Sequence, residues 1–346
     1  MRTSTRIILA LLLLATPLLA AEIGLRVLVI AHRLPFADAH RDDFEITWAN
    51  LERIGTPDVL VLGDSVTQQG VEPLVLERLV RRAVGSDVSV FNAASPGGGL
   101  GVNAAIVEEL AAQGRLPRVI VVGVATGTLS TDITFREIFS RTVMGRLFAG
   151  CDVPMPLADR VDCYGASLSM VWRWRGHPRD IIEAIAEPLP STDRTDGLRL
   201  RADGFRVGRG RSIAQIERQL GKVDLDKRRV VLDPDVESSW RWLVETAEAN
   251  GAVVVPVAIP DTPPMLARME EVQPGREALY WDGIDRLERA AGVQFVRVRS
   301  LGEWWGDGMA RNFNHLSHEG ARRFSRQLWT MDDFHEPLLE ALDAPE

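Results

Sequence analysis

The sequence predicts an α/β protein of three layers, in which a parallel sheet of about five strands lies between two layers of helices. Two observations carry this prediction. Short apolar runs alternate along the chain with longer segments whose apolar residues recur at helical spacing, and this alternation is typical of a parallel sheet covered on both faces. The runs Val59–Leu62 and Val119–Val124 hold only apolar residues and glycine, as strands do when both faces are buried.

The individual elements follow from these patterns. We expect strands over five apolar runs: Asp58–Leu62, Val88–Phe91, Val119–Val124, Ala252–Ile259 and Val293–Val298. We expect helices over five segments with an apolar stripe: Pro73–Val84, Asn103–Gln113, Pro234–Ala249, Glu277–Ala291 and Gly320–Trp329. Gly251 and Gly292 lie just beyond two of these segments, where glycine commonly ends a helix.

The stretch from about residue 128 to residue 229 lacks this alternation and is expected to be an insertion above the strand ends. Cys151 and Cys163 lie in it and form either a disulfide or two buried free thiols. An arginine-rich run forms either a surface for an anionic polymer or lipid headgroup, or a solvated loop: Arg199, Arg201, Arg206, Arg209 and Arg211. Residues 55–346 then make one domain with this insertion, preceded by a connector over residues 32–54.

The N-terminal 31 residues resemble a targeting segment. Arg2 and Arg6 precede an apolar run, Ile7–Ala21, and the apolar character resumes after Glu22. We interpret the segment as an uncleaved signal anchor, with a cleaved signal peptide or a short helix of a cytosolic domain as alternatives. On either of the first two interpretations the rest of the chain lies outside the cytoplasm, at the cell membrane or in the periplasm.

Composition and motifs exclude several classes of function. The formal net charge of -8 argues against a general nucleic-acid binder. No cluster of residues with metal-site spacing is found, so no metal is expected. The segment Gly99–Ala104 fits a dinucleotide fingerprint, but the strand after it ends without an acidic residue for a ribose. We therefore expect no cofactor.

A candidate nucleophile follows the first predicted strand. Ser65 comes directly after the apolar run and Gly63, at the sheet edge where ligands of open α/β sheets bind. A serine hydroxyl needs a base to take its proton. His315 is the best placed of six histidines, because it lies between the last predicted strand and the last predicted helix, and hence at the same sheet edge. His318 is the second choice.

Together these two segments resemble the SGNH/GDSL hydrolase superfamily, which carries Gly-Asp-Ser after its first strand and a His-Leu pair before its last helix. Here the matching residues are Gly63, Asp64 and Ser65, and then His315 and Leu316. The resemblance implies a flavodoxin-like fold, Ser65 as the nucleophile and His315 as the base. It also implies that an oxyanion is bound by the backbone N–H of Ser65 and that of a glycine after the second strand, which is Gly97.

Two positions depart from the family. Asn312 stands where the family has the aspartate that orients the histidine, and it can hold the imidazole without supplying a negative charge. Asp307 is an alternative support for His315. Gly127 stands near the position of the family's oxyanion-binding asparagine, and three residues are candidates to replace that side chain: Thr126, Thr128 and Asn103.

The sequence thus predicts an extracytoplasmic serine esterase or O-acyltransferase that acts on acyl esters of a small molecule or a cell-envelope glycan. The membrane is expected as a partner through the N-terminal helix, and nucleic acid is not. The two departures leave a second hypothesis open, namely a catalytically impaired relative that binds an acylated glycan or a partner.

Overall fold

A computed structural model describes residues 15–27, 47–48, 50–129, 161, 165, 169, 171, 199–225, 229–232 and 235–343. The chain divides into two compact units. Unit 1 comprises Met1–Asp42 and Arg136–Arg194, and unit 2 comprises Asp43–Phe135 and Thr195–Glu346. Cys151 and Cys163, the predicted disulfide pair, lie outside the described residues.

Unit 1 contains a helix over residues 15–27. Its Glu22 pairs with Arg26 and accepts hydrogen bonds from Ser169 Oγ and Val171 N, each at 3.0 Å. The predicted signal anchor is wrong, because no helix in the described part of the chain is both long and apolar enough to cross a membrane. Glu22 also interrupts the apolar residues of the described helical stretch. The predicted location at the cell membrane, which rested on this anchor, is therefore not supported.

Unit 2 contains a five-stranded parallel sheet in the order β2-β1-β3-β6-β7. The strands cover Val59–Leu62 (β1), Val90–Asn92 (β2), Val119–Val124 (β3), Val253–Ala258 (β6) and Val296–Arg297 (β7). Every residue of β1 and β3 is buried, which is why these runs are apolar throughout. The predicted α/β fold with five parallel strands is therefore confirmed.

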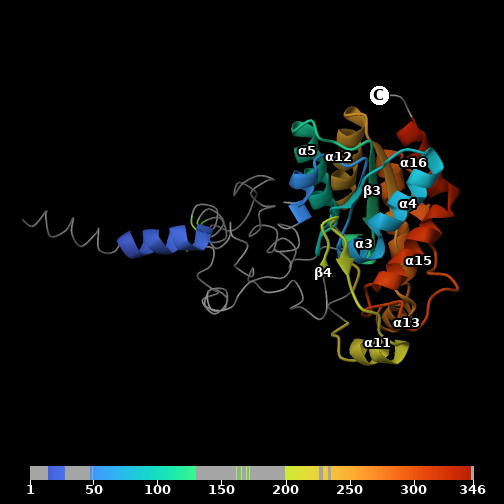
Figure 1. Ribbon diagram of the computed structural model, residues 1–346. Helices are drawn as coiled ribbons and strands as arrows, with labels where there is room; N and C mark the ends of the chain where they lie inside the picture. The colour runs from blue at the N-terminus through green and yellow to red at the C-terminus, as the bar shows by residue number, and fades with distance from the viewer. Residues whose placement is uncertain are drawn as a thin grey trace, which may run out of the picture. The chain divides into compact units, whose positions relative to one another are not determined.

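Helices cover both faces of the sheet. In Figure 1, α5 (Leu100–Ala112) and α12 (Val236–Ala249) lie on one side of β3, and α4 (Pro73–Val84), α15 (His318–Trp329) and α16 (Asp332–Asp343) lie on the other. Helix α14 (Arg276–Ala291) packs against α12. The three layers bury a continuous apolar core between them, whose largest fully buried side chains include Trp240, Phe91 and Phe324.

Shorter elements cluster around the carboxyl ends of the strands and were not predicted. They are α3 (Ser65–Gly70), a 3-10 turn η1 (Thr126–Leu129), a hairpin of β4 (Arg199–Leu200) and β5 (Arg206–Val207), α11 (Ile213–Leu220) and α13 (Pro263–Val272). Each is short or lacks the repeating apolar stripe on which helix prediction depends.

The hairpin shows that part of the predicted insertion belongs to unit 2. Phe205, between its two strands, is fully buried in the core. Arg201 forms an ion pair of 2.7 Å with the buried Glu72, a second ion pair with Asp203, and a cation–π contact with Phe205. At least Arg201 of the arginine-rich run therefore makes contacts inside unit 2.

Candidate active site

The turn between β1 and α3 places Ser65. Gly63 adopts a φ of 146°, and a Cβ at this position would lie 2.7 Å from the carbonyl oxygen of Gly123 and collide with the side chain of Thr67. Only glycine fits such a turn without strain. Helix α3 then begins at once with Ser65, which is half-buried at the carboxyl end of β1.

Asp64 caps this helix. Its Oδ1 accepts hydrogen bonds from the backbone N–H of Val66 at 2.9 Å and of Thr67 at 3.3 Å, and its Oδ2 accepts one from Thr128 Oγ1 at 3.2 Å. Burial raises the pKa of Asp64 to about 6, with a further contribution from the charge of Asp261, although these hydrogen bonds oppose the shift. The family-like Gly-Asp-Ser segment therefore has a structural reason for its aspartate: it fixes the first turn of α3.

A loop between β7 and α15 carries His315. Ala310 bridges both to Arg211 and to Leu316, so the loop folds back on itself and is held by the segment after the hairpin. Ser317 closes the loop: its hydroxyl donates to the carbonyl of Gly308 at 2.6 Å and caps α15.

The two predicted catalytic residues meet, although they are 250 positions apart in the chain. His315 Nε2 lies 2.9 Å from Ser65 Oγ. On the other side of the ring, His315 Nδ1 lies 3.0 Å from Asn312 Oδ1. The structure thus brings Ser65, His315 and Asn312 together in one hydrogen-bonded row.

The backbone around Asn312 determines which ring nitrogen carries the proton. Asn312 Oδ1 accepts hydrogen bonds from the backbone N–H of Asn314 at 2.9 Å and of His315 at 2.8 Å. Because both partners are donors, the atom that faces His315 must be the amide oxygen and not the nitrogen. His315 Nδ1 therefore donates, and Nε2 of the neutral ring is left to accept the proton of the Ser65 hydroxyl.

Asp307 and His318, the alternatives to Asn312 and His315, make their contacts elsewhere. Asp307 accepts a hydrogen bond from the backbone N–H of Ile213 at 2.8 Å, at the start of α11. His318 begins α15, where its backbone N–H donates to Gly208 and its ring lies against Phe205. Neither residue occupies the place that Asn312 and His315 fill beside Ser65.

The predicted oxyanion donors are two backbone amides. Neither Ser65 N–H nor Gly97 N–H has a hydrogen-bond acceptor among the residues that the structure describes. Gly97 is exposed with a φ of 74°, and a Cβ on the next residue, Gly98, would lie 2.5 Å from the carbonyl oxygen of Gly63. This turn therefore packs directly against the turn that precedes Ser65, and both amides remain available at the same sheet edge.

The side chains proposed to replace the family's oxyanion-binding asparagine are buried, and two of them donate hydrogen bonds to carboxylates. Gly127 has no side chain and is exposed, and its Cβ direction points toward Asp64 Oδ2 at 3.6 Å. Thr128 donates to Asp64, and Thr126 donates to Asp261 at 3.1 Å. Asn103 is buried within α5, and its Nδ2 has no partner in the described part of the chain. Both threonine hydroxyls are therefore already engaged with carboxylates and do not serve as donors to an oxyanion beside Ser65.

Beneath the serine lies a buried polar cluster that sequence reasoning missed. Asp261 follows β6 and pairs with Arg276 at 2.9 Å, and Thr126 also donates to it. Burial raises the pKa of Asp261, against the effects of Arg276 and Thr126. Tyr280 donates to the carbonyls of Val124 at 2.8 Å and Ile259 at 3.2 Å, and burial raises its pKa well above the usual value. An acid directly after the apolar run of β6 was the available signal for this cluster.

Arg311 links the histidine loop to the serine helix. Its Nη1 donates to Gln69 Oε1 at 3.0 Å, and Gln69 Nε2 donates to the carbonyl of Ser65 at 3.3 Å. Phe313 is held from the other side, because Thr262 donates to its carbonyl and its ring packs on an apolar cluster of α11 and α13. These contacts fix the position of His315 relative to Ser65.

Among the residues that the structure describes, one group of side chains could hold a metal ion, and it lies on α16. Asp332, His335 and Glu336 present ligand atoms within 4.8 Å of one another. Two of the three are exposed, and His335 Nδ1 is also 3.1 Å from the carbonyl of Met331. None of the three contacts Ser65 or His315 in the described structure, so this group has no part in the site.

Comparisons with known proteins give no family for this chain. No family model matches it, and no curated protein matches it. One similar solved structure is a chain from Streptococcus pneumonia provisionally described as a platelet activating factor, with 14% identity over 93% of this chain and 97% of that chain. Its TM-score of 0.32 is too low to carry an argument. Conclusions about function therefore depend on the geometry of the site.

Proposed function

We propose that this protein is a serine esterase or O-acyltransferase of the SGNH type that acts on acyl esters. The observation that carries the proposal is the row from Ser65 through His315 to Asn312, with separations of 2.9 Å and 3.0 Å. A hydroxyl that donates to an imidazole of fixed tautomer is the arrangement required of an activated serine nucleophile. The Gly-Asp-Ser and His-Leu segments support the same assignment.

The chemistry proceeds in two halves. Ser65 Oγ attacks the acyl carbonyl while its proton passes to His315 Nε2, and the N–H groups of Ser65 and Gly97 bind the oxyanion. His315 then gives this proton to the alcohol oxygen of the leaving group, which departs, and the acyl group remains on Ser65 Oγ. Water or a sugar hydroxyl attacks the acyl-enzyme, with His315 as base, and the serine is regenerated.

Asn312 makes this catalyst weaker than one with a carboxylate in the same place. The amide oxygen holds the ring and its tautomer, but it does not stabilise the positive charge that His315 acquires. The glycine at position 127, in place of the family's asparagine, acts in the same direction if no other side chain replaces that donor, since removal of one such donor costs about 3 kcal/mol. We therefore expect turnover of activated esters that is slow but dependent on both residues.

The experiment is hydrolysis of p-nitrophenyl acetate by the full chain. Wild-type protein is compared with Ser65→Ala and with a matched control, Ser169→Ala, which removes a hydroxyl outside the site. Turnover that Ser65→Ala abolishes and Ser169→Ala retains supports the proposal. A rate that is the same in all three proteins overturns it for simple esters.

The second candidate is a relative that binds an acylated glycan without turnover. The two departures, Asn312 and Gly127, favour it. Isothermal titration with an O-acetylated oligosaccharide distinguishes the two candidates: saturable binding without release of acetate supports a binding protein, and release of acetate supports the enzyme.

A further inference from the structure

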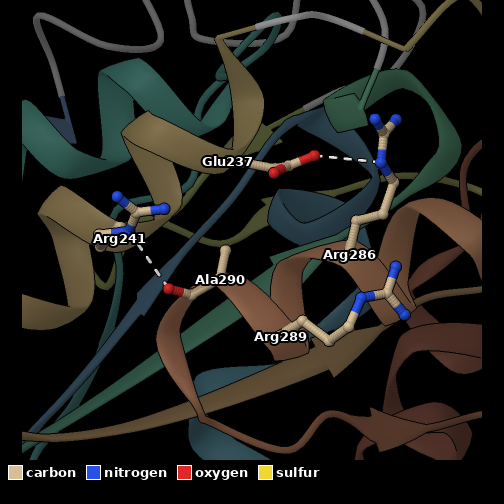
Figure 2. A pocket seen from close by; sticks show the side chains of 5 residues that line it. All are labelled: Glu237, Arg241, Arg286, Arg289 and Ala290. Carbon is tan, nitrogen blue, oxygen red and sulfur yellow. Dashed lines mark hydrogen bonds and ion pairs between the residues drawn. The ribbon is translucent and has the colours of Figure 1, made fainter.

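A basic cavity lies between α12 and α14, apart from the candidate active site. Its volume is about 340 Å³. Figure 2 shows the side chains that line it: Glu237, Arg241, Arg286, Arg289 and Ala290. Three arginines and one glutamate leave a formal excess of two positive charges in a small volume. None of these residues contacts Ser65, Asn312 or His315 in the part of the chain that the structure describes.

Two of the arginines are held in place by contacts that use only their Nε atoms. Arg286 Nε forms an ion pair of 3.0 Å with Glu237 Oε1, and Arg241 Nε donates to the carbonyl of Ala290 at 3.2 Å. Both contacts are drawn in Figure 2. In each case the two Nη groups, which carry four of the five N–H donors of a guanidinium, take no part in this contact.

Arg289 has no hydrogen-bond or ion-pair partner among the described residues. It lies in the last turn of α14, and a positive charge there balances the negative carboxyl end of the helix. One cation suffices for that effect, and Arg241 already donates to the carbonyl of Ala290. All three arginines are exposed, and Glu237 balances the charge of Arg286. Arg241 and Arg289 have no acidic partner among the described residues, so an anion bound between them would relieve their repulsion.

We propose that this cavity binds a multivalent oxyanion, such as the phosphate group of a small molecule. Guanidinium groups match the geometry of phosphate oxygens and donate to them in pairs. The cavity lies at the lower end of the usual size range of small-molecule sites, about 300 to 1,000 Å³, so it accommodates more than a bare phosphate ion. The first turn of α12, which contains Glu237, adds the positive end of a helix dipole to the same site.

Glu237 has two opposing effects on a bound anion. Its carboxylate holds Arg286 in position, but it also competes with a ligand for that arginine and lowers the net charge of the cavity. Replacing it by glutamine removes the competing charge and keeps the length of the side chain. An anion site should therefore respond to changes at Glu237 and Arg289 in opposite directions.

The test is isothermal titration of the full chain with inorganic pyrophosphate, in a buffer of low ionic strength that contains no other phosphate. We compare wild type with Arg289→Gln, Glu237→Gln and a control, Arg268→Gln, which removes one exposed arginine of α13 from its ion pair with Glu271. We expect Arg289→Gln to weaken binding about tenfold, Glu237→Gln to tighten it, and Arg268→Gln to leave it unchanged within about twofold.

Three results would overturn the proposal. The first is the absence of saturable binding in wild-type protein. The second is an equal loss of affinity in Arg289→Gln and Arg268→Gln, which indicates attraction to overall charge alone. The third is unchanged or weaker binding in Glu237→Gln. Because Arg289 makes no described contact, failure of its variant to bind is not explained by misfolding, and circular dichroism of each variant verifies this.

Discussion

The two sides of the Ser65–His315 pair are stabilised in different ways. On the serine side, a buried carboxylate, Asp64, caps the helix that begins with the nucleophile. On the histidine side, a neutral amide, Asn312, accepts three hydrogen bonds and fixes the tautomer of the ring. Orientation and charge are therefore separable in such a row: Asn312 supplies a fixed orientation to the ring and carries no charge of its own.

The largest effect is expected at His315, and the neighbouring His318 serves for comparison. His315→Ala removes the proton acceptor of Ser65 and should lower kcat/KM for p-nitrophenyl acetate by about 10³-fold or more. His318→Ala should leave kcat/KM within about threefold of wild type, because its ring packs against Phe205 and not against Ser65. Steady-state kinetics of the two variants checks this prediction, and a larger loss in His318→Ala contradicts the assignment of the base.

The next prediction concerns Asn312, whose amide lacks the negative charge of a carboxylate. Asn312→Ala should lower kcat about 100-fold, because the ring loses its fixed tautomer. Asn312→Asp should raise kcat, since a carboxylate stabilises the protonated ring while its oxygen keeps the same backbone contacts.

The pH profile gives this test a second readout. A protonated His315 cannot act as the base, and the new carboxylate favours that protonated form. The acid limb of kcat/KM in Asn312→Asp should therefore move to higher pH, and a profile identical to wild type would show that Asn312 does not act through His315.

A smaller effect concerns the carboxylate on the serine side. Folded Asp64 keeps its proton up to about pH 6, whereas the unfolded chain releases it near 3.8. The folded state thus binds more protons in this interval, and the free energy of unfolding should fall by up to about 3 kcal/mol as the pH rises from about 4 to 6. Asp64→Asn, which keeps a capping oxygen, should flatten this dependence.

Urea unfolding at pH 4.5 and pH 7 measures the difference. Glu77→Gln, which removes a half-buried carboxylate of α4 that pairs with Arg81 at 2.9 Å, serves as the charge-matched control. If Asp64→Asn has the same loss of stability between the two pH values as wild type, the raised pKa of Asp64 is not the cause.

The smallest expected effect comes from the support of the histidine loop. Thr262→Val removes the hydroxyl that donates to the carbonyl of Phe313 and should cost about 1 to 2 kcal/mol of folding free energy, with a reduction of less than tenfold in kcat. Thr246→Val, at a half-buried position of α12, is the matched control. A loss of activity as large as that of Asn312→Ala would mean that the loop, and not the amide, sets the position of His315.

The sequence was sufficient to predict the sheet and the proximity of Ser65 and His315. The five strands are apolar runs with little ambiguity, and α4 was expected over the residues it occupies, Pro73–Val84. Ser65 and His315 were identifiable because each follows a recognisable strand or precedes a helix at the same sheet edge. Asn312 was a candidate only through the resemblance to the SGNH/GDSL hydrolases, which have an aspartate at that position.

Other parts of the molecule were not predictable for specific physical reasons. The buried cluster of Asp261 and Arg276 depends on contacts between segments that no local pattern links. Helix α16 contains Pro337, which ordinarily indicates a helix end. The predicted N-terminal anchor was wrong because no helix in the described part of the chain is long and apolar enough to cross a membrane, and Glu22 makes polar contacts within unit 1.

The most direct test of the central claim is covalent trapping of the nucleophile. The full chain is incubated with a fluorophosphonate, digested and examined by mass spectrometry. We predict a single phosphonate adduct on the peptide that contains Ser65, absent in Ser65→Ala and formed at least about 100-fold more slowly in His315→Ala. No adduct in wild-type protein, or an adduct that persists in Ser65→Ala, would contradict the claim that His315 activates Ser65.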